Sequence, residues 1–180
     1  MEERTFEIQC MRKNEVYCVR LKGKKFYSHM GLVKFLHLNM IEYEDRSGLD
    51  SIGTYKAFSK KIDNLKTQLV SMLLELKAHG KSIVGYGGSA TTTTLLYHFG
   101  LSKMIDYIVD DNPAKQNTFS PGYHIPVLSS DVLYERKPDY VLILAWRYAG
   151  PIMKKHQAYL EQGGHFIVPL PKIVVKGDEN

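Results

Sequence analysis

The stretch that most constrains the fold of this chain covers residues 81–100. A short apolar run at 82–84 predicts a buried strand, three glycines follow it closely, and a hydroxyl-rich segment then opens an apolar helix. The order of strand, glycine turn and helix start leaves unpaired backbone N–H groups and the positive end of a helix dipole facing one point. The sequence therefore predicts a site for a phosphate or a carboxylate on an α/β sheet.

Further short apolar runs follow along the C-terminal half of the chain. The predicted strands lie at residues 105–109, 125–127, 140–145 and 166–168. Helices are expected between them, including one over 151–162, and a long amphipathic helix over 55–76 precedes the glycine turn. Apolar strands separated by helices are typical of a parallel sheet that is covered on both faces. We therefore predict an α/β fold, namely a Rossmann-like parallel sheet with helices on both faces.

The N-terminal part has a different pattern. Residues 5–11 and 16–21 alternate between apolar and polar side chains, and Lys13 and Asn14 between them suit a hairpin turn. A short helix is expected between residues 26 and 43, and the polar stretch 42–48 is the most linker-like part of the chain. We predict an N-terminal β-hairpin and helix as an appendage over residues 1–47, followed by the Rossmann-like domain over residues 48–180.

Composition excludes several classes of function. The net charge of +5 comes from lysines in small groups, without an arginine-rich arm or a zinc pattern, so we expect no nucleic-acid partner. No apolar run is long enough for a membrane span and the start lacks the features of a signal peptide, which favours a cytoplasmic protein with no membrane partner. Cys10 and Cys18 flank the predicted hairpin turn, and we expect free thiols and no metal site.

Open α/β sheets bind ligands beyond the carboxyl ends of their strands. The candidate residues by this rule follow four predicted strands: Tyr86, Gly87, Gly88 and Ser89 after the first, Asp110, Asp111 and Asn112 after the second, Trp146, Arg147 and Tyr148 after the fourth, and residues 169–172 after the last. His124 lies in a loop with proline and glycine, where it is either a hydrogen bonder that fixes the loop or a ligand contact.

The other histidines carry less weight. Those on predicted helices or at their ends are expected to be surface or filler residues: His29, His37, His79, His98 and His156. No Ser/His/Asp order, Cys/His pair or metal spacing is present, so no catalytic residue is predicted.

A dinucleotide-binding interpretation stays open on spacing. Residues 85–90 fit the pattern G-x-G-x-x-A, and Asp110 follows Gly85 by 25 residues, near the position of a ribose-binding acid. The same acid could instead cap its own turn, and many Rossmann-like domains use this glycine turn for other ligands.

Four segments in order carry a more specific resemblance: GYGGSATTTTLL, DYIVDDNPAKQNTFSPGYHIPV, KPDYVLILAWRYAGPI and GGHFIVPLP. Together they resemble the C-terminal domain of nucleotide-sugar C-methyltransferases that depend on S-adenosylmethionine, over residues 48–171. These enzymes add a branching methyl group to a deoxysugar carried on a nucleoside diphosphate. In them, a zinc-binding domain and a methyl-donor domain precede this one.

The resemblance implies that this domain holds a nucleotide sugar, such as a thymidine-diphosphate deoxyhexose, against a methyl-donor domain in the same or another chain. It adds Thr91, Lys115 and His124 to the substrate-binding residues given above. It also implies that S-adenosylmethionine serves the full-length enzyme, that this chain alone binds no cofactor and is not catalytic, and that the N-terminal hairpin could end a methyl-donor domain. Thr91 stands where the family pattern has a lysine, and Arg147 where it has an asparagine.

Two alternatives of other classes remain at this point. One is a small NAD(P)-binding domain of an oxidoreductase or redox sensor. The other is a non-catalytic interaction module that keeps the fold without the ligand.

Overall fold

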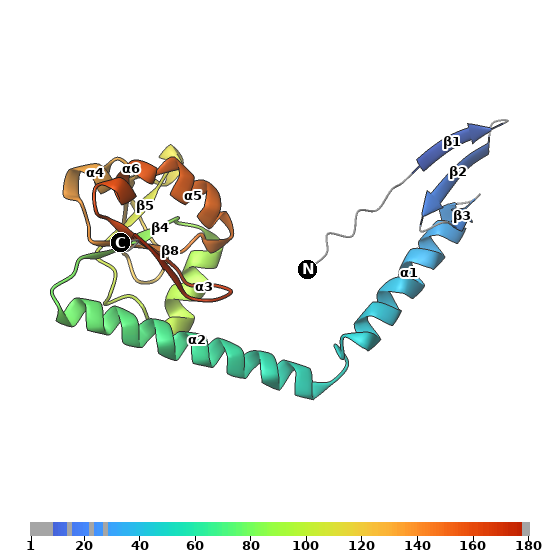
Figure 1. Cartoon of the computed structure of the whole chain (residues 1–180), viewed down its shortest axis with the longest axis horizontal. Helices are drawn as coiled ribbons and strands as arrows, with labels where there is room; N and C mark the ends of the chain where they lie inside the picture. The colour runs from blue at the N-terminus through green and yellow to red at the C-terminus, as the bar shows by residue number, and fades with distance from the viewer. Residues whose placement is uncertain (1–8, 14–15, 22–23, 27–28, 178–180) are drawn as a thin grey trace. The chain divides into compact units, whose positions relative to one another are not determined.

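The computed structural model describes residues 9–13, 16–21, 24–26 and 29–177, with side chains from residue 37 onward (Figure 1). The chain forms two compact units, Met1–Ser59 and Lys60–Asn180, which we describe one at a time. The predicted division into residues 1–47 and 48–180 stays a prediction. No helix among the described residues is long and apolar enough to cross a membrane.

The N-terminal unit contains a small antiparallel sheet. Its strands are β1 (Gln9–Lys13), β2 (Val16–Leu21) and β3 (Lys24–Phe26), hydrogen-bonded in the order β1-β2-β3. The predicted hairpin is confirmed by the β1–β2 pairing, while residues 5–8 and Asn14 lie outside the described residues. Cys10 pairs with Val19 and Cys18 pairs with Met11, so the two cysteines are not directly opposite each other. The short strand β3 was not predicted.

A tight corner joins helices α1 (His29–Arg46) and α2 (Ile52–Ala78). Gly48 has a φ of +63°, and the Leu49 N–H donates to the Glu44 carbonyl at 3.1 Å, which ends α1. The Tyr55 hydroxyl donates to the Leu49 carbonyl at 2.6 Å and ties the first turns of α2 to this corner. The predicted linker over 42–48 is wrong for residues 42–46, because these residues continue α1.

The C-terminal unit is built on a seven-stranded sheet in the order β10-β9-β8-β4-β5-β7-β6. The bounds of its strands are β4 (Ile83–Tyr86), β5 (Ile108–Asp110), β6 (Thr118–Phe119), β7 (Pro126–Ser129), β8 (Tyr140–Ile143), β9 (His165–Val168) and β10 (Val174–Lys176). The five strands β4, β5, β7, β8 and β9 are parallel, and the edge strands β6 and β10 are antiparallel. The chain order reverses between β4 and β8, as in a Rossmann-type sheet.

Helices cover both faces of this sheet (Figure 1). Their bounds are α3 (Ala90–Phe99), α4 (Val132–Arg136), α5 (Ala149–Lys155) and α6 (Gln157–Glu161), with short 3₁₀ turns η1 (Pro113–Lys115) and η2 (Trp146–Tyr148). One face packs Ile83 and Leu142 against α3 and the second half of α2. The other packs Val84 and Val141 against α4, α5 and α6. Side chains that alternate along each strand therefore pack into two separate apolar cores, one on each face of the sheet.

The predicted fold class is confirmed, with two differences. The sheet is mixed at its edges, where two antiparallel strands were not predicted. β6 has only two residues, and the short apolar run at residues 173–175, which includes most of β10, was not interpreted as a strand. The helix predicted over 151–162 is interrupted at His156, which ends α5 and precedes α6.

Candidate functional site

The glycine turn after β4 is fixed by close packing. Gly87 has a φ of +97°, and a Cβ atom placed on it would lie 2.5 Å from the Cβ of Ala145, just after β8. Only glycine suits this combination of left-handed backbone and close approach. The turn is therefore held against the loop that follows β8.

The amides of this turn have partners within the chain. The Gly87 N–H donates to the Val109 carbonyl at 2.8 Å, the Gly88 N–H to Asp110 Oδ2 at 2.7 Å, and the Ser89 N–H to Thr92 Oγ1 at 3.2 Å. This differs from the expectation of unpaired N–H groups at the bend. An anion could reach the Gly88 amide only by displacing the Asp110 carboxylate.

Hydroxyl groups gather at the start of α3. Thr92 is buried, and its hydroxyl donates to the Gly87 carbonyl and accepts from the Ser89 N–H. The Ser89 and Thr91 hydroxyls are hydrogen-bonded to each other at 2.8 Å. These contacts cap the first turn of α3, and the neighbouring Thr93 is half-buried.

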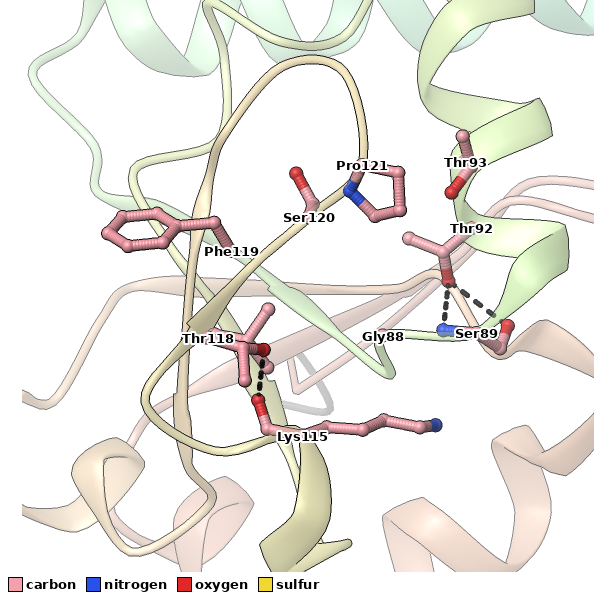
Figure 2. A pocket seen from close by; sticks show the side chains of 10 residues that line it. Gly88, Ser89, Thr92, Thr93, Lys115, Thr118, Phe119, Ser120 and Pro121 are labelled. Carbon is pink, nitrogen blue, oxygen red and sulfur yellow. Dashed lines mark hydrogen bonds between the residues drawn. The ribbon is translucent and has the colours of Figure 1, made fainter.

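A pocket of about 200 Å³ opens beside this turn. We call it the α3 pocket; it is lined by Gly88, Ser89, Thr92, Thr93, Lys115, Thr118, Phe119, Ser120, Pro121 and Val127. Figure 2 shows the Lys115 side chain reaching toward Gly88 and Ser89, whereas the Phe119 ring points away from them. The pocket lies beyond the carboxyl ends of β4 and β5, as the rule for open sheets requires.

Asp110 organises the loop that forms one wall of the α3 pocket. Besides the Gly88 amide, its Oδ2 atom contacts the Lys115 ammonium at 3.2 Å, and its Oδ1 atom accepts from the Asn112 N–H at 2.8 Å. The Asn112 side chain in turn accepts from the Ala114 N–H at 3.0 Å and caps the turn η1. A buried carboxylate thus places Lys115 at the mouth of the glycine turn.

The structure brings together only part of the predicted set. Gly88, Ser89 and Lys115 line the α3 pocket, and Asp110 contacts two of these residues. Trp146 and Arg147 follow β8 and do not line the pocket; the Arg147 guanidinium lies 5.3 Å from the centre of the Trp146 ring. His124 is exposed with a φ of +52°, again outside the pocket lining.

Tyr86 points to the opposite face of the sheet. Its hydroxyl lies 2.8 Å from His156 Nε2, and the Tyr134 hydroxyl lies 2.9 Å from His156 Nδ1. His156 is only 3% exposed, so the expectation of a surface or filler position is wrong: it bridges two tyrosines. Burial lowers the pKa of His156 and raises the pKa of the Tyr86 hydroxyl.

Asp111 borders this buried histidine. Its Oδ1 atom accepts from the Ser130 hydroxyl at 2.6 Å, and its Oδ2 atom lies 2.7 Å from the Lys155 ammonium. Burial opposes ionisation of Asp111, but the hydrogen bonds from Lys155 and Ser130 outweigh it and hold its pKa below the ordinary value. The rule for open sheets indicated Tyr86 and Asp111 but not their partners His156, Ser130 and Lys155, which lie after other strands and far away along the chain.

The sequence prediction also missed one wall of the α3 pocket. Thr118, Phe119, Ser120 and Pro121 were not proposed, although they belong to the loop after the second predicted strand, where the fold rule applies. Among the described residues, no group of three or more His, Cys, Asp or Glu side chains could hold a metal ion.

Comparison with known proteins identifies the family of this domain. Residues 36–171 match the family model described as the C-methyltransferase C-terminal domain. The chain belongs to this family. The resemblance drawn from the four sequence segments is thereby confirmed, and the C-methyltransferase domain includes the end of α1 and all of α2.

A curated relative agrees with this assignment. The chain is 34% identical over 134 residues to the C-methyltransferase NovU of Streptomyces niveus. The match covers 74% of this chain but 32% of the relative. The C-methyltransferase domain described here thus corresponds to about a third of the relative's length.

Proposed function

We propose that this chain binds the nucleotide sugar of a C-methyl transfer reaction in the α3 pocket, while a separate methyl-donor domain supplies the methyl group. Two observations together support the proposal. The chain belongs to a C-methyltransferase family, and a pocket at the carboxyl ends of β4 and β5 is lined by Lys115 and several hydroxyl groups. The substrate class is a nucleoside-diphosphate sugar, with a thymidine-diphosphate deoxyhexose as our first candidate. S-adenosylmethionine would serve the methyl-donor domain, in the same or another chain.

Lys115 is the main source of positive charge in this proposal. Its side chain is 39% exposed, so it can turn from Asp110 toward a diphosphate without crossing a packed region. The start of α3 favours an anion by about 0.3–1 kcal/mol, which orients a diphosphate but gives little affinity. A charge-assisted hydrogen bond from Lys115 is worth about 1.5–3 kcal/mol, and the loss of the Lys115 contact with Asp110 reduces the net gain.

The rest of the pocket suits a polar ligand. The hydroxyls of Ser89, Thr93 and Ser120 border it and can donate to phosphate or sugar oxygens. The Thr118 hydroxyl donates to the Lys115 carbonyl instead. Within the pocket lining, no histidine, cysteine or carboxylate is present to act as a base or nucleophile. This composition supports a domain that holds a polar substrate.

Asp110 gives the NAD(P) alternative no support. A ribose-binding acid needs a carboxylate oxygen that is open to the ligand. Here Oδ2 accepts from the Gly88 amide and contacts Lys115, while Oδ1 accepts from the Asn112 amide.

Isothermal titration calorimetry tests the proposal. We expect the chain to bind thymidine diphosphate and its sugars, and not NADH or S-adenosylmethionine. Lys115→Met should weaken binding by tenfold or more, since about 1.4 kcal/mol corresponds to a factor of ten. Lys103→Met, which alters an exposed lysine beyond the opposite end of α3, should bind as the unaltered chain does.

The other outcomes discriminate between the alternatives. Binding of S-adenosylmethionine alone would reverse the division of labour proposed here. Binding of NADH alone would favour an oxidoreductase. If none of these ligands gives a heat of binding, a non-catalytic interaction module is favoured.

A further inference from the structure

The loop between β6 and β7 is closed by hydrogen bonds between its two ends. We call residues 120–125 the β6–β7 loop. The Ser120 N–H donates to the Ile125 carbonyl at 2.8 Å, and the Ile125 N–H donates to the Ser120 hydroxyl oxygen at 3.0 Å. Both end residues are buried, whereas Pro121 and Gly122 in the middle are exposed. The ends of the loop are therefore fixed, and the position of its middle depends on what the middle contacts.

Tyr97 of α3 contacts the middle of this loop. Its ring is stacked on the Tyr123 ring, with 4.2 Å between the ring centres and 16° between the ring planes. Gly122 has a φ of +78°, and a Cβ atom placed on it would lie 1.6 Å from the Tyr97 hydroxyl oxygen. Tyr123 in turn packs against the apolar core. The Tyr97 hydroxyl thus occupies a space that only glycine leaves open, and this contact holds the loop against α3.

The same loop and the same helix form two sides of the α3 pocket. Ser120 and Pro121 line it from the loop, and Thr93 lines it from the helix. Figure 2 shows Pro121 and Thr93 on these two sides. Because Thr93 and Tyr97 are four residues apart, they are neighbours on one face of α3. The Tyr97 contact therefore sets the distance between the two sides of the pocket.

We propose that the contact between Tyr97 and Gly122 positions the β6–β7 loop to receive the nucleoside part of the ligand. This inference rests on the proposed function, in which Lys115 takes the diphosphate. The sugar that accepts the methyl group has to meet a methyl-donor domain, so the nucleoside is the part that stays between the loop and α3. Tyr97 does not line the pocket and acts through the loop. It keeps Ser120 and Pro121 in place, so that binding does not have to order them.

Calorimetry of the full chain with two ligands tests this role. Tyr97→Ala should weaken the binding of thymidine diphosphate by about fivefold to tenfold, because the ligand then has to order the loop. The affinity for inorganic pyrophosphate, measured by its competition with thymidine diphosphate, should change by less than about twofold, because pyrophosphate has no nucleoside to contact the loop. Lys115→Met should weaken the binding of both ligands.

Further variants separate positioning from a merely structural role. Tyr97→Phe keeps the stacked ring and should bind as the unaltered chain does. His98→Ala, which removes an exposed ring from the same helix outside the pocket lining, should do likewise. Gly122→Ala tests the contact from the loop side: its Cβ atom forces the loop away from Tyr97, so the same selective loss is expected. Thermal unfolding verifies that each variant is folded, and Tyr97, at 49% exposed, should be replaceable without unfolding the domain.

The outcomes distinguish this inference from the proposed function. If the unaltered chain binds no thymidine diphosphate, the proposed function fails and the inference fails with it. If the unaltered chain binds and Tyr97→Ala binds equally well, the inference alone is wrong. An equal loss for pyrophosphate, or no competition by pyrophosphate, would also overturn it. Should Tyr97→Ala not fold, Gly122→Ala decides by the same criteria.

Discussion

The carboxylate of Asp110 accepts a hydrogen bond from the backbone N–H of Gly88 at 2.7 Å. The same oxygen lies 3.2 Å from the Lys115 ammonium. An anion in the α3 pocket would therefore compete with Asp110 for both partners. The aspartate keeps the glycine turn and the lysine in place before any ligand arrives.

Replacing Asp110 with asparagine should reduce stability. Asp110 is buried, and a neutral amide in its place would lose the charge-assisted contacts to Gly88, Asn112 and Lys115. We expect the free energy of unfolding to fall by about 1–3 kcal/mol in urea titrations. Asp106→Asn is the control, because its ion pair with Lys77 is exposed and should contribute less than about 1 kcal/mol. Equal losses for the two variants would contradict a special role for Asp110.

The glycines at positions 87 and 88 should respond differently to alanine. In Gly87→Ala the new Cβ would lie 2.5 Å from the Ala145 Cβ on a left-handed backbone, so we expect a loss of about 1–3 kcal/mol in thermal or urea unfolding. In Gly88→Ala the nearest atom, Asp110 Oδ2, is 3.5 Å away, so the fold should be retained. Because Gly88 lines the α3 pocket, calorimetry should show weaker nucleotide binding; undiminished binding would argue against this pocket.

His156 should make stability depend on pH in the weakly acidic range. Its folded-state pKa lies below the ordinary value of 6.5 because the ring is buried, so the unfolded chain binds the proton more readily. The free energy of unfolding should therefore fall as the pH drops below 6.5. In His156→Gln this decrease should be absent, although the variant is less stable at neutral pH. Urea titrations across this pH range make the comparison, and parallel curves would show that other groups cause the decrease.

Asp139 should contribute to stability down to much lower pH. The Ser82 hydroxyl and amide donate to its carboxylate at 2.7 and 2.9 Å and lower its pKa to about 2. Its contribution is present above the ordinary pKa of 3.8 and is lost as the pH falls toward 2. The carboxylate is over a third exposed, so we expect no more than about 1 kcal/mol. In Asp139→Asn, urea titrations should show a smaller loss of the free energy of unfolding over this acidic range. An unchanged loss would contradict the assignment.

The local patterns of the sequence were enough for the fold class. The apolar runs that became β4, β5, β7, β8 and β9, the glycine turn and the amphipathic helix α2 all depend on neighbouring residues and their periodicity. The edge strands β6 and β10 could not be predicted in this way. Each is only two or three residues long and pairs on one side only, so its pairing is decided by the strand beside it.

The site divides along the same line. The sequence alone predicted a glycine turn at the start of a helix, with Asp110, Lys115 and the hydroxyl residues nearby. It also indicated membership of a C-methyltransferase family. Only the tertiary structure decided that Asp110 takes the Gly88 amide, that Tyr86 turns to His156 on the other face, and that the loop over 115–121 lines the pocket in place of Trp146 and Arg147. The reason is that these partners lie far apart along the chain, and the order and twist of the strands determine which of them meet.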